Sequence, residues 1–247
     1  RRWTWHACPC CTMNVARLVA SVGGYFYSTS SDTLAVHLYG GNSARASVGG
    51  TTVRVKETSD YPWSGSIHMA IDPEAPATFT LKLRIPGWAR NATARVNGAA
   101  IDVARNIDRG YLAISRRWSA GDAVDLDLPM PVERLYAHPS VSMDAGRAAL
   151  KRGPLVYCAE QVDNPSVPVA RVRLPRTAHV AATERRDLFD GIVTVTVDGK
   201  AIGSDGWADT LYRTEPPQAT AATWTAVPYY LWNNREPGKM LVWIPEG

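Results

Sequence analysis

The chain has 247 residues, of which 45% are hydrophobic and 20% are charged, a composition typical of a folded globular protein and unlike that of a disordered one. The formal net charge is +4, and the basic residues are scattered rather than gathered in the stripe that nucleic-acid binding requires. No stretch approaches the ~20 consecutive apolar residues of a membrane-spanning helix. We therefore expect neither nucleic acid nor a membrane as a partner.

The chain does not begin with Met, and its first residues read as the middle of a domain. We expect it to be a piece of a longer gene product, so the sequence leaves the compartment open. The free thiols described below favour reducing conditions, in a bacterial cytoplasm or periplasm.

Residues 12–23 predict the one convincing helix. Thr12 or Asn14 can cap its start, and the pair Gly23 and Gly24 can end it. One face carries apolar residues at helical spacing, which we expect to pack into a core: Val15, Leu18, Val19 and Val22.

Three of the four cysteines, Cys8, Cys10 and Cys11, lie within four residues, directly before this predicted helix. A disulfide scaffold would spread its cysteines along the chain, so the cluster favours metal or reactive-thiol chemistry. Free N–H groups and the positive end of the helix dipole favour a thiolate there. Two interpretations stay open: zinc ligands with one nucleophilic thiolate, or a structural zinc site or inert thiols. Cys158 lies in an apolar strand and is expected to be a small buried hydrophobe.

A tetrahedral zinc site needs about four ligands, and neighbouring residues cannot easily supply three of them. The remaining ligands must come from elsewhere, including residues absent from this chain. His6 is a nearby candidate, although a supporting or surface role is more common. The other histidines have no metal-ligand spacing, and the nucleophile elbow, phosphate loop and dinucleotide fingerprint are missing.

From about residue 27 the sequence predicts short β-strands at regular spacing, as in a β-sandwich. Residues 78–86 alternate between apolar and polar side chains, and Asn97-Gly98 is a tight-hairpin signal. The first set of predicted strands is 36–38, 53–57, 78–86, 94–96, 111–114 and 124–128.

Pro129-Met130-Pro131 marks a boundary, and a second set of strands follows. Residues 203–222 read as loop, and the end of the chain returns to aromatic strands. The chain has nine tryptophans, which suit sugar stacking but more often belong to a core. The second set is 132–136, 148–150, 155–158, 169–174, 192–197, 224–232 and 240–244.

Seven segments together resemble glycoside hydrolase family 127, the β-L-arabinofuranosidases and their relatives. They are residues 5–17 (WHACPCCTMNVAR), 23–27 (GGYFY), 36–39 (VHLY), 83–88 (LRIPGW), 96–98 (VNG), 152–160 (RGPLVYCAE) and 228–235 (PYYLWNNR). The double-cysteine segment is specific, and the segments in the β region support it.

The resemblance implies a mainly β chain with two β-sandwich domains, the second inserted in the first, preceded by a short helical remnant of an (α/α)6 barrel. Residues 1–26 would end the catalytic barrel, residues 27–131 plus 223–247 would form the first sandwich, and residues 132–222 the second. The missing N-terminal barrel of the same protein would then be a partner of this chain.

The resemblance also implies a retaining glycoside hydrolase that acts on an arabinofuranoside-type or related sugar. Cys10 would be the nucleophile and a zinc ligand, Cys11 a second zinc ligand, and Cys8 a supporting residue. The acid/base Glu and the other zinc ligands would lie N-terminal to this chain, so we expect the chain alone to be inactive. Pro9, and Thr12-Met13 in place of the Pro-Pro of many members, leave the exact sugar open.

Two other hypotheses stay open. One is a carbohydrate-binding or scaffolding β-sandwich module without catalysis, suggested by the aromatic-rich strands. The other is a structural zinc or redox thiol protein, suggested by the cysteine cluster alone.

Overall fold

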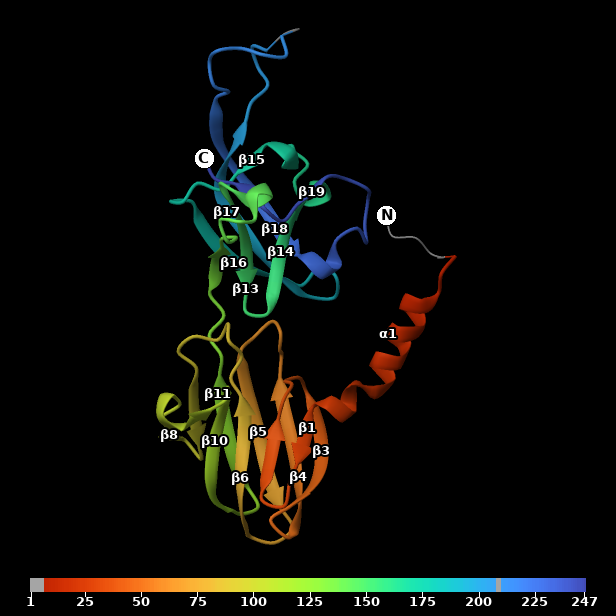
Figure 1. Ribbon diagram of the computed structural model, residues 1–247, viewed down its shortest axis with the longest axis vertical. Coiled ribbons are helices and arrows are strands. Elements are labelled where there is room, and N and C mark those ends of the chain that lie inside the picture. Colours follow the sequence, from red (N-terminus) through yellow and green to blue (C-terminus); the bar gives the residue numbers. More distant parts are fainter. Residues whose placement is uncertain (1–6, 208–209) are drawn as a thin grey trace. The chain divides into compact units, whose positions relative to one another are not determined.

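The computed structural model describes residues 7–207 and 210–247 (Figure 1). The chain is mainly β, as predicted, and divides into two compact units at Met130 and Pro131. One α-helix, α1 (Cys10–Ser21), precedes the strands of the described part. No helix in these ranges is long and apolar enough to cross a membrane. Short 3-10 turns lie at Val22–Tyr25, Ala104–Asn106, Ser142–Asp144, Gln161–Asp163, Val169–Arg171 and Tyr229–Leu231.

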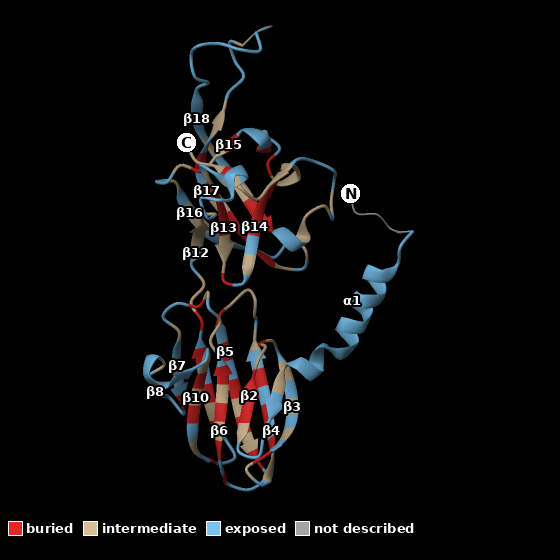
Figure 2. Cartoon of the chain, viewed as in Figure 1, coloured by how far each residue is buried: buried red, intermediate tan, exposed pale blue. Residues whose placement is uncertain are grey.

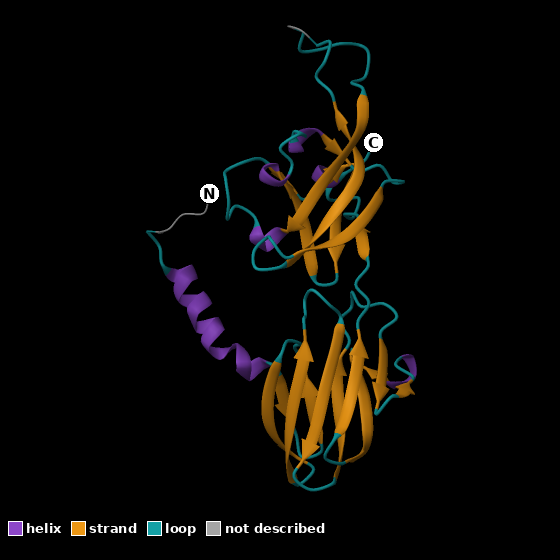
Figure 3. Ribbon diagram, turned by 180° about the vertical axis from the view of Figure 1, so that it is seen from behind, coloured by secondary structure: helices purple, strands orange, loops and turns teal. Residues whose placement is uncertain are grey.

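The first unit is a β-sandwich of two sheets (Figure 3). The first sheet has the order β1 (Tyr27–Thr29), β2 (Thr33–Val36), β6 (Ala77–Arg84), β10 (Tyr111–Trp118) and β9 (Ile107–Asp108). The second has the order β3 (Asn42–Val48), β4 (Thr51–Ser59), β5 (Ser66–Pro73), β11 (Asp122–Asp127), β7 (Thr93–Val96) and β8 (Ala99–Ile101). Strand β2 runs parallel to β6, whereas β10 and β6 are antiparallel.

Alternation along the strands builds the core of this sandwich. Phe79, Leu81 and Leu83 of β6 are buried, while the polar residues between them point outward. Figure 2 shows the same alternation of buried and exposed residues along the neighbouring strands. Full burial of each such side chain contributes about 1.5–3 kcal/mol. The hairpin signal is confirmed, because Asn97 and Gly98 both have positive φ angles, of 50° and 80°, between β7 and β8.

The second unit is one nine-stranded sheet around its own core. Its path is β12 (Val132–Leu135), β13 (Arg147–Arg152), β14 (Leu155–Glu160), β18 (Ala219–Pro228), β17 (Ile192–Ile202) and β15 (Val172–Arg173). Strand β16 (His179–Arg185) pairs with β17, β19 (Met240–Leu241) with β14, and β20 (Ile244–Pro245) with β13. The Arg134 side chain of β12 donates to the carbonyls of Leu174 and Ala178, so one sheet edge lies beside the segment that leads into β16.

The predicted insertion of the second sandwich in the first is wrong. Strand β18 lies between β14 and β17 in the middle of the second sheet, and β19 and β20 pair with strands of the same unit. Residues 223–247 therefore belong to the second unit, which is continuous from Pro131. The physical reason is burial, because Trp224 and Ala226 of β18 and Ile244 of β20 fill that unit's core. The predicted loop 203–222 is also too long, since β18 starts at Ala219.

Six strands of the described residues are missing from the ranges predicted individually: β1, β3, β5, β8, β9 and β16. Strand β16 is half-exposed or exposed along its whole length and lacks the alternating apolar residues that indicate a half-buried strand. Strand β3 alternates only weakly, because two of its three apolar residues are alanines and only Val48 is buried. Strand β5 does alternate, with Ile67, Met69 and Ile71 buried, and this signal was available in the sequence.

Candidate functional site

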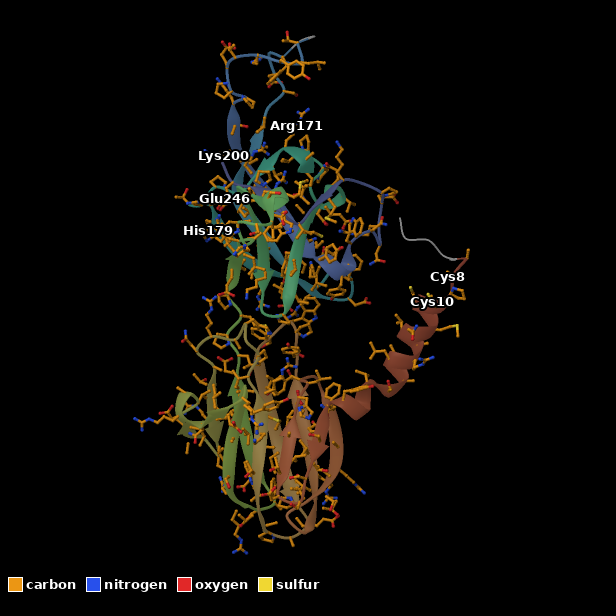
Figure 4. The ribbon with its side chains drawn as sticks, in the orientation of Figure 1. Cys8, Cys10, Arg171, His179, Lys200 and Glu246 are labelled. Atoms are coloured by element: carbon orange, nitrogen blue, oxygen red, sulfur yellow. The ribbon has the colours of Figure 1, made fainter. Side chains whose placement is uncertain are left out.

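The cysteine cluster lies at the N-terminal end of α1 (Figure 4). The helix begins at Cys10, two residues earlier than predicted, with Pro9 at the cap position and no side-chain cap. The capping prediction is wrong: the Thr12 hydroxyl donates to the Pro9 carbonyl at 2.8 Å, and the Asn14 amide donates to the Cys10 carbonyl at 2.8 Å. Cys10 and Cys11 therefore belong to the first helical turn, where backbone N–H groups have no helical acceptor.

The helix ends at Ser21, and Gly23 and Gly24 lie in the 3-10 turn that follows. Its apolar face is not buried in the described chain, because no residue of α1 is buried and Val15, Leu18 and Val19 are 57–68% exposed. This face therefore packs into no core within the described residues, and its packing against helices outside this chain stays a prediction. Helix α1 thus carries three of the four cysteines at or just before its N-terminal end and an unburied apolar face along its length.

The three sulfur atoms of the cluster lie close together. The Cys10 Sγ atom is 3.4 Å from Cys8 Sγ and 3.9 Å from Cys11 Sγ. All three thiols are free and exposed. Cys10 is therefore the central thiol, within reach of both neighbours.

The cysteine pair Cys10 and Cys11 fits part of a zinc site. Two sulfur ligands on one tetrahedral zinc, with Zn–S bonds of about 2.3 Å, lie about 3.8 Å apart, close to the 3.9 Å observed. Thiolate is also a ligand type that zinc prefers. In the two described ranges, no group of three or more His, Cys, Asp or Glu residues is placed to hold a metal ion, and His6 lies outside them. The described residues thus hold two thiols at a spacing that a zinc ion would accept, and no complete set of ligands.

Cys158 is a free thiol like those of the cluster but differs from them in its burial. It is fully buried in β14, and burial raises the pKa of its thiol to about 12. The prediction that Cys158 is a small buried residue is confirmed. Two histidines of the first unit have other polar partners: His37, directly after β2, contacts the hydroxyls of Tyr111 and Ser28, each at 2.7 Å, and His68 of β5 contacts Asp125 at 2.7 Å.

An ion-pair network joins two of the segments that carry the family resemblance. Arg235 donates to Glu160 at 2.9 Å and to both oxygens of Asp163 at 2.5 and 2.6 Å. The backbone N–H of Asn233 donates to the other Glu160 oxygen at 3.1 Å. Residues 152–160 and 228–235 are therefore held together in the second unit, a contact that no local sequence pattern indicates. Two tryptophans, Trp118 and Trp224, are core residues rather than exposed platforms.

Comparison with known proteins gives the chain its family. Residues 33–130 match the middle domain of the glycoside hydrolase family 127 β-L-arabinofuranosidases. Residues 132–245 match the C-terminal domain of the same family. The chain belongs to glycoside hydrolase family 127. The domain boundary between these two matches agrees with the division of the structure at Met130 and Pro131.

The relatives of this chain are longer than the chain itself. A non-reducing end β-L-arabinofuranosidase of Bifidobacterium longum subsp. longum is 37% identical over 98% of this chain and 37% of its own length. The crystal structure of a family 127 β-L-arabinofuranosidase from Geobacillus stearothermophilus T6 is 43% identical, with a TM-score of 0.95, over the whole of this chain and 39% of that one. A solved family 127 β-arabinofuranosidase is 33% identical, with a TM-score of 0.90, over 98% of this chain and 39% of that one. This chain thus spans about two fifths of the length of these relatives.

Proposed function

We propose that this chain is the nucleophile-bearing and β-domain portion of a retaining glycosidase that removes terminal β-L-arabinofuranosyl groups or a related sugar. The observation that carries the proposal is the exposed Cys10 thiol in the first turn of α1, 3.4 and 3.9 Å from two further thiols, in a chain of family 127. Nucleophilic sulfur needs exposure and an environment that favours the thiolate. A helix N-terminus provides such an environment.

In the proposed reaction the Cys10 thiolate attacks the anomeric carbon of the sugar. The sulfur–carbon bond forms as the glycosidic carbon–oxygen bond breaks, and an acid protonates the departing oxygen. Water then attacks the same carbon, returns the electron pair to sulfur and yields the sugar with retained configuration. A zinc ion held by Cys10 and Cys11 would keep the thiol deprotonated and oriented. Cys8, in the segment before the helix, would have a supporting role beside Cys10.

We propose that the acid/base group and the remaining zinc ligands come from residues outside this chain. Among the described residues, no group of three or more His, Cys, Asp or Glu side chains is placed to hold a metal ion. The unburied apolar face of α1 suits a helix that packs against further helices. The chain should therefore be inactive alone. The test is turnover of an aryl β-L-arabinofuranoside by the reduced, zinc-supplemented chain beside the full-length Geobacillus stearothermophilus relative. Turnover by the relative alone is the expected result, whereas turnover by this chain would place an acid and metal ligands inside it.

A second candidate function is carbohydrate binding without catalysis. A hollow of about 310 Å³ on the first sandwich is lined by residues that include His37, Lys82, Asp108 and Tyr111. Lys82 donates to Asp108 at 3.0 Å, and such donor–acceptor pairs beside an aromatic ring suit sugar hydroxyls. Calorimetry with arabinofuranosyl oligosaccharides tests this function. A heat of binding that is lost in the Lys82→Ala variant and kept in the Lys200→Ala variant would support this function. No heat of binding with the unsubstituted chain would reject it.

A further inference from the structure

The sulfur atoms of Cys8 and Cys10 are closer together than two sulfur ligands of one zinc ion would be. Their sulfur atoms are 3.4 Å apart, shorter than the ~3.8 Å separation of two sulfurs on one tetrahedral zinc. The two thiols are free and exposed. From this geometry we infer that Cys8 and Cys10 form a reversible disulfide on oxidation by a peroxide, with Cys8 as the resolving cysteine for Cys10.

The proposed oxidation has two balanced steps. The Cys10 thiolate first attacks one peroxide oxygen, so that the O–O bond breaks and hydroxide leaves as water, giving a sulfenic acid on Cys10. The Cys8 thiolate then attacks the Cys10 sulfur, the S–O bond breaks, and a second water leaves as the disulfide forms. Sulfur is oxidised by two electrons and the peroxide is reduced by two. A dithiol reductant returns both thiols by exchange.

The structure favours Cys8 over Cys11 as the resolving thiol. An S–S bond is about 2.05 Å long, so Cys8 Sγ must approach by about 1.3 Å from its observed 3.4 Å. Cys8 lies before α1, and the hydrogen bond from Met13 N–H to the Pro9 carbonyl is the first of the helix, so the backbone of Cys8 is not held by the helical ladder. Cys11 is adjacent to Cys10 and is inside that ladder. A disulfide between adjacent residues closes a strained ring.

Cys158 provides an internal reference. It has no exposed surface, and a buried thiol with little thiolate character reacts slowly with peroxide. Oxidation of the folded chain should therefore stay within the N-terminal cluster. Oxidation of Cys158 would report unfolding instead.

The consequence for activity rests on the proposed function, because a disulfide would remove the nucleophilic sulfur and then release it again on reduction. The oxidation itself does not depend on that function. Mass spectrometry of peptides detects the disulfide without any substrate, so its absence would leave the glycosidase proposal standing. Likewise, if Cys10 is not the glycosidase nucleophile, its oxidation can still be measured.

The experiment titrates the reduced 247-residue chain with hydrogen peroxide, blocks remaining thiols with N-ethylmaleimide, and maps the peptide that holds the cluster by mass spectrometry. We expect this peptide to lose two hydrogens (about 2 Da), with Cys8 and Cys10 joined and unalkylated, Cys11 alkylated, and Cys158 alkylated only after denaturation. A dithiol reductant should restore three alkylatable thiols in the folded chain and four after denaturation. Cys11→Ser is the matched control and should form the same disulfide.

The Cys8→Ser variant makes the proposal decisive. Without the resolving thiol, Cys10 should pass on to sulfinic and sulfonic acids, which the reductant does not reverse. Three results would overturn the proposal: a Cys10–Cys11 bond in the parent chain, sulfinic acid on Cys10 beside a free Cys8, or the same Cys10 products with and without Cys8. Alkylation of Cys158 only after denaturation verifies that every variant is folded.

Discussion

The buried ion-pair network of the second unit gives a prediction whose size follows from the structure. Replacing Arg235 with Ala removes the guanidinium that contacts Glu160 at 2.9 Å and Asp163 at 2.5 and 2.6 Å. The side chains of Glu160 and Asp163 are only 2% and 12% exposed. The Glu160 carboxylate would keep the N–H of Asn233 and lose its charged partner. A buried charge without its partner is strongly destabilising.

The expected cost is about 3–5 kcal/mol of unfolding free energy. For a unit of about this size, that corresponds to a fall in Tm of very roughly 10–20 °C. The matched control is Arg185→Ala. Its bidentate contact with Asp187 has distances of 2.8 and 2.7 Å, but the two side chains are 43% and 66% exposed. An exposed pair contributes about 1 kcal/mol or less, so the two variants separate burial from ion pairing.

Urea unfolding of the chain, followed by tryptophan fluorescence and circular dichroism, measures both variants. The chain has two units, so the transition that involves Trp224 of the second unit is the relevant one. Arg235→Ala should shift this transition and leave that of the first unit in place. A loss below about 1 kcal/mol for Arg235→Ala, equal to that of the control, would refute the argument from burial.

Three further predictions concern glycine, pH and thiol reactivity. Gly65→Ala should cost about 1–3 kcal/mol, because a Cβ there would lie 1.9 Å from the Leu128 carbonyl oxygen, whereas Gly87→Ala has open space and should change thermal unfolding little. Burial raises the pKa of Glu57, so the native state binds this proton more tightly than the unfolded chain; the first unit should lose stability as pH rises from about 4.3 toward the raised value, and Glu57→Gln should flatten that slope in urea titrations. Cys158 should resist N-ethylmaleimide in the folded chain while the three cluster thiols react within minutes, and equal rates for all four, read by mass spectrometry, would contradict its burial.

Much of the fold follows from local sequence patterns. The alternation in residues 78–86 and the Asn97-Gly98 pair each predicted an element that the structure contains. Such patterns depend on neighbours along the chain, and the pleat of a strand turns them directly into a buried and an exposed face. The boundary near residue 130 was equally visible as a Pro-rich break.

Local sequence patterns do not predict which strands pair when the strands are far apart in the sequence. The last strands were assigned to the first sandwich on the basis of the family resemblance, yet β18 pairs with β14 and β17. An aromatic strand fits a half-buried surface in either unit, so its composition does not select the sheet. The pairing is decided by long-range packing, in which Trp224 donates its indole N–H to the Arg173 carbonyl and fills the second core.

The candidate site was predictable in its residues and not in its geometry. The cysteine cluster was evident in the sequence, but the central place of Cys10 between two sulfurs required coordinates. The helix was predicted to begin at residue 12 because Thr12 and Asn14 are good capping residues. Instead, Thr12 donates to the carbonyl of Pro9 and Asn14 donates to that of Cys10, and the helix begins at Cys10.

The most direct test of the central claim is a chimera in which this chain replaces the aligned two fifths of the Geobacillus stearothermophilus relative. Turnover of an aryl β-L-arabinofuranoside is compared between the chimera, its Cys10→Ala variant and its Cys158→Ala variant. We predict an active chimera that loses about 10³-fold or more of its kcat with Cys10→Ala and keeps its kcat with Cys158→Ala. Undiminished turnover by the Cys10→Ala chimera would contradict the assignment of Cys10 as the nucleophile.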